Sequence, residues 1–531
     1  MNNKQFWMTI FSLVAGMVLG TVSAVASATE ITWGGDIIVR PFLRDNARDF
    51  DAAGSANDKK EFTTERARLK ANVKVDDDIS GVVELLHFRK WGAADPNRVV
   101  DANGTPNNSN CSLVAGTATA SGVSCSNPAL DDNWLDLNQA YIEVKNVFDT
   151  GWYTRIGRQE MAYGDQRLIG NTNFWSTYPF PRAYDAVKIG TKNDTFDLDV
   201  WAATVTERQL GTLFGPLFAA SGVSANNTTE PKDRMFYGAW GTLKTIPDNT
   251  VDLYLLAMSE GGYNKNGSIQ AYESIGIPPN FGHLPYVSNV GATSMDASRV
   301  YNFGARLKGK YGNFDYTVEG NQQNGQAMDG ANINANSFAT VLGLTVPEAM
   351  GLRVSGEYVF ASGDENPTAG EHTTFYQFSP SPHMHLGAQD FIAFQNINAW
   401  RIGASFNAKP NLKITGDFWD FSLNKANDYW YGSNGISTRA GTSAIAGYGA
   451  EGKLADVHVG TEVDLKANYD YSKALSFEAG YSRFTPGSGI NNAGTAVAGG
   501  PACVAGTTLT GHTCGKGDNA NFAWGMLMLK F

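Results

Sequence analysis

Residues 66–74 read Arg-Ala-Arg-Leu-Lys-Ala-Asn-Val-Lys, so that polar and apolar side chains alternate without a break. An alternation of period two predicts a β-strand with one polar face and one apolar face. The same pattern recurs at residues 32–40, 139–145 and 301–308. Such strands occur in a soluble sheet that covers a core, and also in a barrel with lipid outside and water within. The apolar faces alone do not separate these two possibilities.

The connections between the predicted strands separate them, because they fall into two classes. Short turns are predicted at 76–78, 146–151, 192–194, 247–249, 311–313, 347–351, 409–411 and 471–474. Long polar stretches lie near 45–62, 92–136, 207–234, 259–298, 363–398, 422–457 and 485–520, with shorter ones near 160–184 and 324–336. Turns on one side and long loops on the other are typical of a transmembrane antiparallel β-barrel, with turns in the periplasm and loops outside the cell. About eight turns and about nine loops predict about 18 strands, an even number as bacterial barrels require.

The last residues of the chain support the same architecture. The chain ends at Phe531, with Leu527 and Leu529 on its face and Met526 and Met528 on the other. A terminal aromatic residue on an alternating final strand is the feature that the barrel-assembly machinery reads. We therefore expect this machinery to recognise the strand that ends at Phe531.

The first 28 residues have the layout of a secretory signal peptide. Lys4 is the single charge of a short n-region, an apolar stretch runs over 6–19, and Ala26-Ser27-Ala28 forms a small-residue cleavage site. The alternative is an uncleaved anchor helix, but the apolar stretch is short for one. We expect residues 29–531 to form one barrel domain after export.

The composition suits a barrel better than an ordinary soluble enzyme. The 531 residues include 58 Gly, 29 Phe, 21 Tyr and 12 Trp, although only 42% are hydrophobic. A barrel needs only a thin lipid-facing band and aromatic girdles, whereas several soluble domains would show cores and linkers. No run of about 20 apolar residues follows the leader, which excludes helical membrane spans. The net charge of −11 argues against nucleic acid as a partner.

The four cysteines form two local pairs within polar stretches. Cys111 lies near Cys125, and Cys503 lies near Cys514. In an exported protein such pairs predict disulfides that close loops. Metal binding is the alternative, but no C-x-x-C spacing occurs and only His512 lies nearby.

Charged residues inside the predicted strands must face the lumen, because lipid tolerates only apolar side chains. Rings of such charges set the ion selectivity of a pore. The candidates for pore lining are Arg66, Arg68, Lys70, Arg155, Arg158, Arg167, Arg182, Asp185, Arg306, Lys308, Glu319, Glu462 and Asp464, with Arg40, Asp36, Glu143 and Asp315 beside them.

Two interpretations compete for these residues. In one, arginines project unpaired into the pore and attract anions. In the other, they pair with carboxylates and hold loops or strands in place. Arg66, Arg68 and Lys70 are the strongest candidates for selectivity, because three basic residues share one face of one strand. Arg158 is out of phase with Arg155, so one of the two is expected near a rim or in a bend.

One part of the chain resembles the alginate-export family of outer-membrane proteins. The resemblance rests first on the motifs Arg155-Ile156-Gly157-Arg158-Gln159, Tyr163-Gly164-Asp165-Gln166-Arg167-Leu168, Trp175 and Arg182-Ala183-Tyr184-Asp185. Supporting matches follow in order at Glu319, Gln323, Gly325, Ala361-Ser362-Gly363-Asp364, Phe375, Leu386-Gly387, 460–465 and 484–487. The resemblance covers the chain from about residue 62 to the end. It implies an 18-stranded monomeric barrel whose lumen is narrowed by arginines and lysines and passes anionic solutes.

The sequence therefore predicts a passive outer-membrane channel for hydrophilic, anionic solutes. One alternative is a dedicated exporter of an anionic polysaccharide such as alginate. Another, of a different class, is a structural sleeve or receptor barrel for a partner protein. No H-E-x-x-H, G-x-S-x-G, P-loop or C-x-x-C-H motif occurs, so neither an enzyme nor a cofactor is expected. Residues His372, His383, His385 and Asp390 resemble a metal set only in type, and we interpret them as ordinary loop residues.

Overall fold

The computed structural model describes the greater part of the chain. Its residues are 30–47, 59–91, 134–171, 182–206, 234–260, 263–264, 294–295, 298–327, 330–366, 370–433, 456–491, 508–509, 512–513 and 517–531. The predicted signal peptide and the predicted disulfides, of Cys111 with Cys125 and of Cys503 with Cys514, lie outside the described residues. Among the described residues, no helix is both long enough and apolar enough to cross a membrane.

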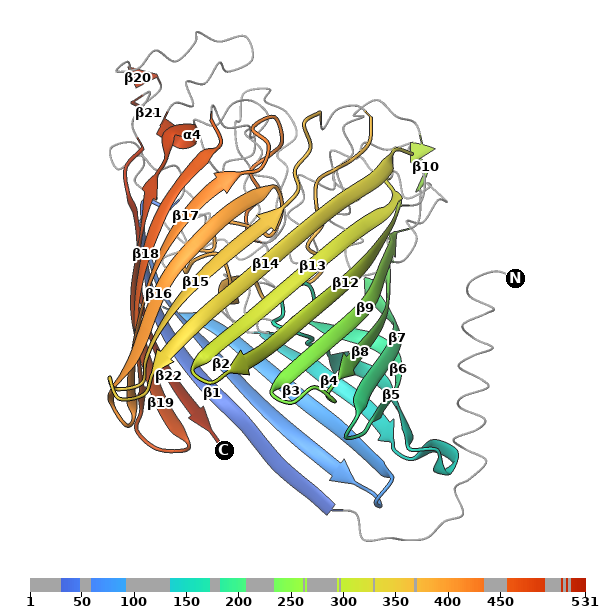
Figure 1. Ribbon diagram of the computed structural model, residues 1–531. Helices are drawn as coiled ribbons and strands as arrows, with labels where there is room; N and C mark the ends of the chain where they lie inside the picture. The colour runs from blue at the N-terminus through green and yellow to red at the C-terminus, as the bar shows by residue number, and fades with distance from the viewer. Residues whose placement is uncertain are drawn as a thin grey trace, which may run out of the picture.

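Eighteen strands form one antiparallel sheet (Figure 1). They are β1 (Glu30–Asp45), β2 (Lys60–Lys74), β3 (Ile79–Trp91), β4 (Trp134–Val144), β5 (Trp152–Glu160), β6 (Ala183–Lys192), β7 (Phe196–Thr206), β8 (Arg234–Leu243), β9 (Asn249–Glu260), β12 (Ser298–Tyr311), β13 (Phe314–Gln326), β14 (Asn332–Val346), β15 (Leu352–Ala361), β16 (Ile397–Lys409), β17 (Leu412–Leu423), β18 (His458–Asp470), β19 (Leu475–Pro486) and β22 (Ala520–Lys530). The predicted strand number is confirmed.

The sheet closes on itself, and each strand pairs with its neighbours in the sequence. The seam joins the first and last strands, where Leu529 of β22 lies opposite Ile37 of β1. Phe531 extends the seam, because its backbone N–H and C=O exchange hydrogen bonds with Gly35 (3.2 and 2.9 Å). Closure leaves no unpaired sheet edge, which lipid could not satisfy. The predicted barrel is therefore confirmed.

The eight turns at one end of the barrel are short, as predicted. They occupy 75–78, 145–151, 193–195, 244–248, 312–313, 347–351, 410–411 and 471–474. Aspartate and asparagine side chains build several of them. Asp76 Oδ1 accepts hydrogen bonds from the backbone N–H groups of Asp78 (2.9 Å) and Ile79 (2.6 Å), and Asn193 does the same for Thr195 and Phe196. These side chains close the turn locally, which explains why turns were recognisable in the sequence.

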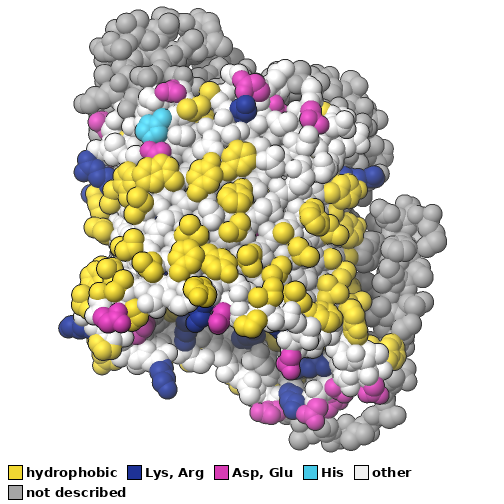
Figure 2. Space-filling model, viewed as in Figure 1, with side chains coloured by type: hydrophobic (Ala, Val, Ile, Leu, Met, Phe, Trp, Pro, Cys, Tyr) yellow, Lys and Arg dark blue, Asp and Glu magenta, His cyan; other side chains and the backbone are white. Residues whose placement is uncertain are grey.

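The strand faces alternate between lipid and lumen. On β12, Tyr301 and Phe303 are more than half exposed on the outside, whereas Asn302 and Arg306 are buried inside. Figure 2 shows the outward hydrophobic side chains as a band across the face in view, with charged side chains gathered above and below it. Such a band is the surface that a lipid bilayer covers.

Short strands and helical turns occur in addition to the barrel strands. The described residues include the two-stranded pairs β10 (Tyr263–Asn264) with β11 (Ser294–Met295) and β20 (Thr508–Leu509) with β21 (His512–Thr513). They also include the 3-10 helices η1 (Val147–Asp149) and η3 (Pro382–Met384) and the one-turn helix α4 (Ser488–Asn491). None of these contributes to the barrel wall.

Candidate functional site

Two loops that join strands at the outer end fold into the lumen. One is the inner segment, residues 161–171 between β5 and β6. The other is the crossing segment, residues 370–396 between β15 and β16. The two pair through their backbones: the N–H of Ser379 donates to the C=O of Leu168 (2.8 Å), and the N–H of Ser381 donates to the C=O of Gln166 (2.9 Å). They therefore form one body inside the barrel.

The crossing segment contacts the wall at two well-separated places. Near its start, the N–H of His372 donates to the C=O of Asn332 on β14 (2.8 Å). Near its end, the side chain of Gln389 donates to the C=O groups of Ser482 on β19 (3.1 Å) and Ala520 on β22 (3.3 Å). Asp390 lies 3.6 Å from Arg44 on β1. The segment thus spans the lumen and narrows it.

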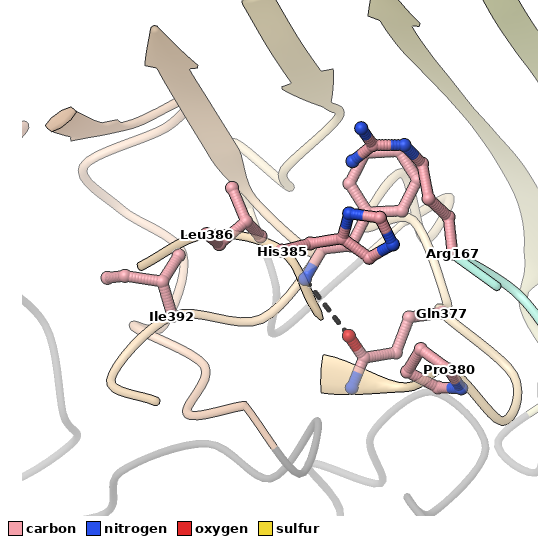
Figure 3. A pocket seen from close by; sticks show the side chains of 7 residues that line it. Arg167, Gln377, Pro380, His385, Leu386 and Ile392 are labelled. Carbon is pink, nitrogen blue, oxygen red and sulfur yellow. Dashed lines mark hydrogen bonds between the residues drawn. The ribbon is translucent and has the colours of Figure 1, made fainter. Parts of the chain in front are cut away.

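An apolar cluster fills the outer half of the lumen around the crossing segment. Phe375, Tyr376, Phe378 and Phe394 are all at most 5% exposed and pack against buried wall residues. A small pocket remains beside Arg167 and is lined by Gln377, Pro380, His385, Leu386, Ile392 and Phe394 (Figure 3). The backbone N–H of Phe394 donates to Oε1 of Gln377 (2.9 Å), which holds these two lining residues together. The body therefore occupies much of the outer lumen.

The inner segment is held to the wall by aromatic stacking and by charge. The ring of Tyr163 stacks on Trp201 of β7 (4.9 Å between centroids) and on Trp240 of β8 (5.1 Å). Asp165 binds Arg306 of β12 (2.6 Å) and Lys308 (3.2 Å). Both basic residues were pore candidates, and both face the lumen.

Arg306 is enclosed between two carboxylates. Its Nη1 lies 2.6 Å from Asp252 of β9, and its Nη2 lies 2.6 Å from Asp165. Its side chain is buried together with that of Asp252. Lys308, two residues nearer the periplasm, keeps 56% of its side chain exposed. Of these two candidates, Lys308 is the one in contact with solvent.

A second network joins the inner segment to the opposite wall. Arg167 binds Glu357 of β15 (2.6 Å), and Glu357 also accepts from Arg401 of β16 (3.0 Å). Arg401 in turn binds Asp417 of β17 (2.6 Å). Since charges alternate along this chain of side chains, each is compensated by the next.

The three basic residues that share a face of β2 have different surroundings. Arg66 Nη2 lies 2.9 Å from one oxygen of Asp36, and Arg68 Nε lies 2.7 Å from the other. Arg68 is also within 4 Å of Glu84 and Glu160. Lys70 lies nearer the periplasm and has no ion pair among the described residues. The pairing interpretation therefore describes the two arginines but not Lys70.

The remaining basic candidates near the motif also have partners. Arg155 binds Glu143 of β4 through its Nε (2.8 Å) and lies over the ring of Tyr141 (4.4 Å). Arg182 Nη1 donates a long hydrogen bond to the C=O of Phe378 in the crossing segment (3.5 Å). Arg155 therefore supports the wall, and Arg182 supports the body inside it.

The acidic candidates bind the lumen body or neighbouring wall residues. Glu319 accepts a hydrogen bond from the hydroxyl of Tyr254 (2.6 Å). Glu462 accepts from the backbone N–H of Gln389 (2.9 Å), and Asp464 accepts from the N–H of Ala388 (3.3 Å). The last two carboxylates therefore anchor the far end of the crossing segment.

Arg158 and Asp185 lie on the outer face of the barrel. They pair at 3.3 Å, and their side chains are 38% and 61% exposed. Their neighbours Tyr184 and Ala186 are buried on the lumen side, so the period-two rule directs Asp185 outward. Gly157 has φ +123°, a conformation that side chains disfavour. The expectation that Arg158 and Asp185 line the pore is corrected by their placement. Arg158 is three residues from Arg155, so the ordinary alternation of β5 directs the two side chains to opposite faces, and β5 pairs in continuous register with β4 and β6.

The histidines of the crossing segment form structural contacts. His383 Nδ1 lies 2.9 Å from Asp390, and His385 Nε2 lies 2.7 Å from the C=O of Asp165. Burial, followed by the nearby charge of Arg167, lowers the pKa of His385 to about 4. The described residues contain no group of three or more side chains able to hold a metal ion.

Several basic residues of the lumen were not among the candidates predicted from the sequence, although the alternation of their strands directs them to the lumen. Arg401 lies on the lumen face of β16, where it binds Glu357. Arg353 lies on the lumen face of β15 and binds Asp315 (2.9 Å). Four lysines near the turns, Lys310, Lys413, Lys466 and Lys530, also fall on lumen faces. A strict period-two count from each turn would have included all of them.

Comparisons with known proteins identify the family. A family model described as alginate export matches residues 42–500. No curated protein matches the chain. Similar solved structures include OprD of Pseudomonas aeruginosa (11% identity, TM-score 0.47, 94% of each chain covered) and OpdK of the same species with vanillate (9%, 0.49, 94% of this chain and 98% of that chain). OccAB2 of Acinetobacter baumannii is also similar (11%, 0.48, 94% and 98%). This chain belongs to the alginate-export family of bacterial outer-membrane β-barrel proteins, which are channels and not enzymes.

Proposed function

We propose that this protein passes hydrophilic, anionic solutes passively through a basic lumen. The family membership makes the chain an outer-membrane channel. Closure of the barrel by a single chain is compatible with a monomer, since no second copy is needed to complete the wall. The crossing segment makes the pathway narrow, so the side chains around it act on solutes at close range.

One observation carries the proposed anion preference. In several lumen ion pairs the basic partner is the more exposed one: Arg68 is 25% exposed against 9% for Asp36, and Lys308 is 56% exposed against 21% for Asp165. Other lumen pairs run the other way: Arg353 and Arg401 with their aspartates, Arg306 with Asp165, Arg66 with Asp36, and Arg167 with Glu357. In the pairs of Arg68 and Lys308 the cation is the group that faces water, so an anion in the lumen contacts the cation and not the carboxylate behind it.

A dedicated exporter of an anionic polysaccharide is the second candidate. The family match favours it, because the matched family is described as alginate export. The alternative of a structural sleeve is less favoured, because a sleeve needs a wide lumen and the crossing segment occupies much of this one.

The test is the zero-current potential of the purified protein in planar bilayers under a potassium chloride gradient. We expect a potential of the sign that anion permeation produces. A matched comparison between chloride and a bulky organic anion then reports the size limit of the passage. A cation-selective potential, or the absence of conductance in properly folded protein, refutes the proposed function.

A further inference from the structure

Side-chain amides gather on the outward face of the barrel, at the outer ends of β13 and β14. We name these residues the amide patch: Gln322, Asn324, Gln326, Asn332, Asn334 and Asn336. The residues that alternate with them on β14, Ile333, Ala335 and Ser337, are at most 4% exposed inside the barrel. The patch therefore points away from the lumen. Figure 2 shows a white area over these strand ends, above the yellow band.

The register of the sheet makes the patch one array. Residues of β13 and β14 pair across it in three rows: Gln326 with Asn332, Asn324 with Asn334, and Gln322 with Asn336. Side chains directly opposite each other on one face lie about 5 Å apart, and successive rows lie about 7 Å apart. The six amides therefore form a continuous polar surface and not scattered single residues.

β12 borders the patch, and its outward residues locate the edge of the bilayer. The three rows lie beside Arg299, Tyr301 and Phe303, in this order toward the membrane. Arg299 is exposed, and Tyr301 and Phe303 are 53% and 57% exposed. Aromatic girdles mark the boundary between hydrocarbon and head groups, so the row of Tyr301 lies at this boundary. The row of Arg299 lies outside it.

The height of the patch matches the head-group layer. From Phe303 to Arg299 the strand rises about 13 Å, which is about 10 Å along the membrane normal at a strand tilt of about 40°. The head-group layer on each side of a bilayer is about 5–8 Å deep. Amides in hydrocarbon without partners are costly, which also excludes a position below this layer.

Much of the hydrogen-bonding capacity of the patch is unused by the protein. The side chains of Asn324, Asn332 and Asn336 have no hydrogen bond to another described residue. Gln322 donates to Asn334 (3.0 Å), and Asn334 donates to Glu371 (3.4 Å) on the side of the patch away from Arg299. Each free carboxamide offers two donor hydrogens and one acceptor oxygen.

This chemistry selects the class of ligand. Sugar hydroxyls both donate and accept hydrogen bonds, so they match an array of carboxamides. The guanidinium of Arg299 at one edge suits a phosphate, which it can bind through two parallel hydrogen bonds. The outer leaflet of a bacterial outer membrane contains glycolipids that carry both groups. The patch is also continuous with the lipid-facing band, because Phe303 and Phe338 lie at its lower border and are exposed.

We propose that the amide patch and Arg299 form a binding site for the phosphorylated sugar head group of an outer-leaflet glycolipid. The acyl chains of the same lipid lie on the apolar band below, next to Phe303 and Phe338. The site is on the outside of the barrel and is independent of the anion preference proposed for the lumen.

The experiment is native mass spectrometry of the purified protein in detergent, titrated with a lipid A that carries two core sugars. Cardiolipin is the matched lipid, because it has acyl chains and phosphates but lacks sugars. We expect wild-type protein to bind the glycolipid roughly tenfold more tightly than cardiolipin, since several amide–hydroxyl hydrogen bonds add to the binding of charge and chains.

The decisive variant combines four substitutions: Asn324→Val, Asn332→Val, Asn334→Val and Asn336→Val. Valine suits a strand, so the barrel should still assemble, and heat-dependent gel mobility checks this. The preference for the glycolipid should vanish in this variant. Arg299→Gln is the milder version and should weaken only the binding of phosphorylated glycolipid, roughly threefold to tenfold. The control changes four outward polar residues at the outer ends of other strands and should keep the preference: Asn398→Val, Thr461→Val, Thr485→Val and Asn521→Val.

Each contrary outcome overturns the assignment. Equal affinity of wild-type protein for the glycolipid and cardiolipin refutes it, and so does an unchanged preference in the folded four-asparagine variant. If the soluble core oligosaccharide competes as well as the whole glycolipid, the patch binds free sugar and not a lipid. If wild-type protein is a dimer that the four substitutions dissociate, the patch joins two copies of the chain instead. The anion preference is tested separately by the zero-current potential.

Discussion

Glu357 connects two arginines from different parts of the chain, and its removal should loosen the body inside the barrel. Arg167 Nη2 lies 2.6 Å from one carboxylate oxygen, and Arg401 Nε lies 3.0 Å from the other. The side chains of Arg167 and Glu357 are only 4% and 7% exposed. Glu357→Gln keeps the shape of the side chain and removes its charge. Arg167 then remains buried without a carboxylate at this distance.

The magnitude follows from the geometry. Breaking a buried ion pair by removing one partner costs about 3–5 kcal/mol, because the other charge stays buried. Arg401 keeps Asp417 at 2.6 Å, so the loss falls mainly on Arg167 and the lower value, about 3 kcal/mol, applies. This energy corresponds to a roughly 150-fold weaker docking of the inner segment. The crossing segment pairs with the inner segment, so both should undock more often.

Single-channel recording measures this effect directly. Glu357→Gln should show a larger mean conductance and more frequent transitions than wild-type protein. Glu348→Gln is the matched control, because Glu348 is exposed on a periplasmic turn. The double variant Glu357→Met with Arg167→Met removes both charges and should recover most of the wild-type behaviour, since replacing a buried pair by apolar residues is often neutral. Unchanged conductance in Glu357→Gln refutes the role of this network in holding the constriction.

Three further predictions concern other parts of the lumen body and the outer face. Burial lowers the pKa of His385 to about 4, below the ordinary value of 6.5, so the neutral imidazole stabilises docking of the crossing segment fully above pH 6.5, and docking loses about 2 kcal/mol by about pH 5. Conductance should therefore rise as the pH falls from about 7 to about 5. A flat conductance profile over this range contradicts the prediction. Gly387 has φ +87°, and a Cβ there would lie 2.6–2.8 Å from the carboxylate of Glu462, so Gly387→Ala should displace the segment and raise conductance in the same recordings; wild-type conductance in this variant contradicts the contact. Arg158→Gln with Asp185→Asn removes an outward, exposed ion pair, so the zero-current potential should stay unchanged and the free energy of unfolding should fall by at most about 1 kcal/mol. A changed zero-current potential would mean that both residues line the pore.

The architecture was predictable because its signals are local. A turn such as 75–78 is closed by the side chain of Asp76 alone, so its position is visible in a few residues. The alternation of residues 66–74 indicates lipid on one face of the strand and water on the other. This pattern can be recognised without knowledge of distant contacts. The number of strands follows from the number of turns and loops.

The placement of Arg158 was less accessible to sequence reasoning. The sequence predicted a bend or a rim near Arg155 and Arg158, whereas β5 pairs in continuous register through both residues. Which of the two arginines faces the lumen depends on the register between β5 and β6, where Arg158 lies opposite Asp185. A register of this kind is a property of paired strands and not of either strand alone.

The sequence by itself determined the closed barrel, its short turns and long loops, and the basic residues on its strands, because alternation and turn chemistry act over neighbouring residues. Only the tertiary structure decided which of those charges are compensated. Arg167 and Glu357 are 190 residues apart in the chain, and they meet because two loops fold into the lumen. The contact of the crossing segment with β22, between Gln389 and Ala520, joins residues 131 apart. Ion pairing depends on distances of a few ångströms between such segments, and no local pattern specifies these distances.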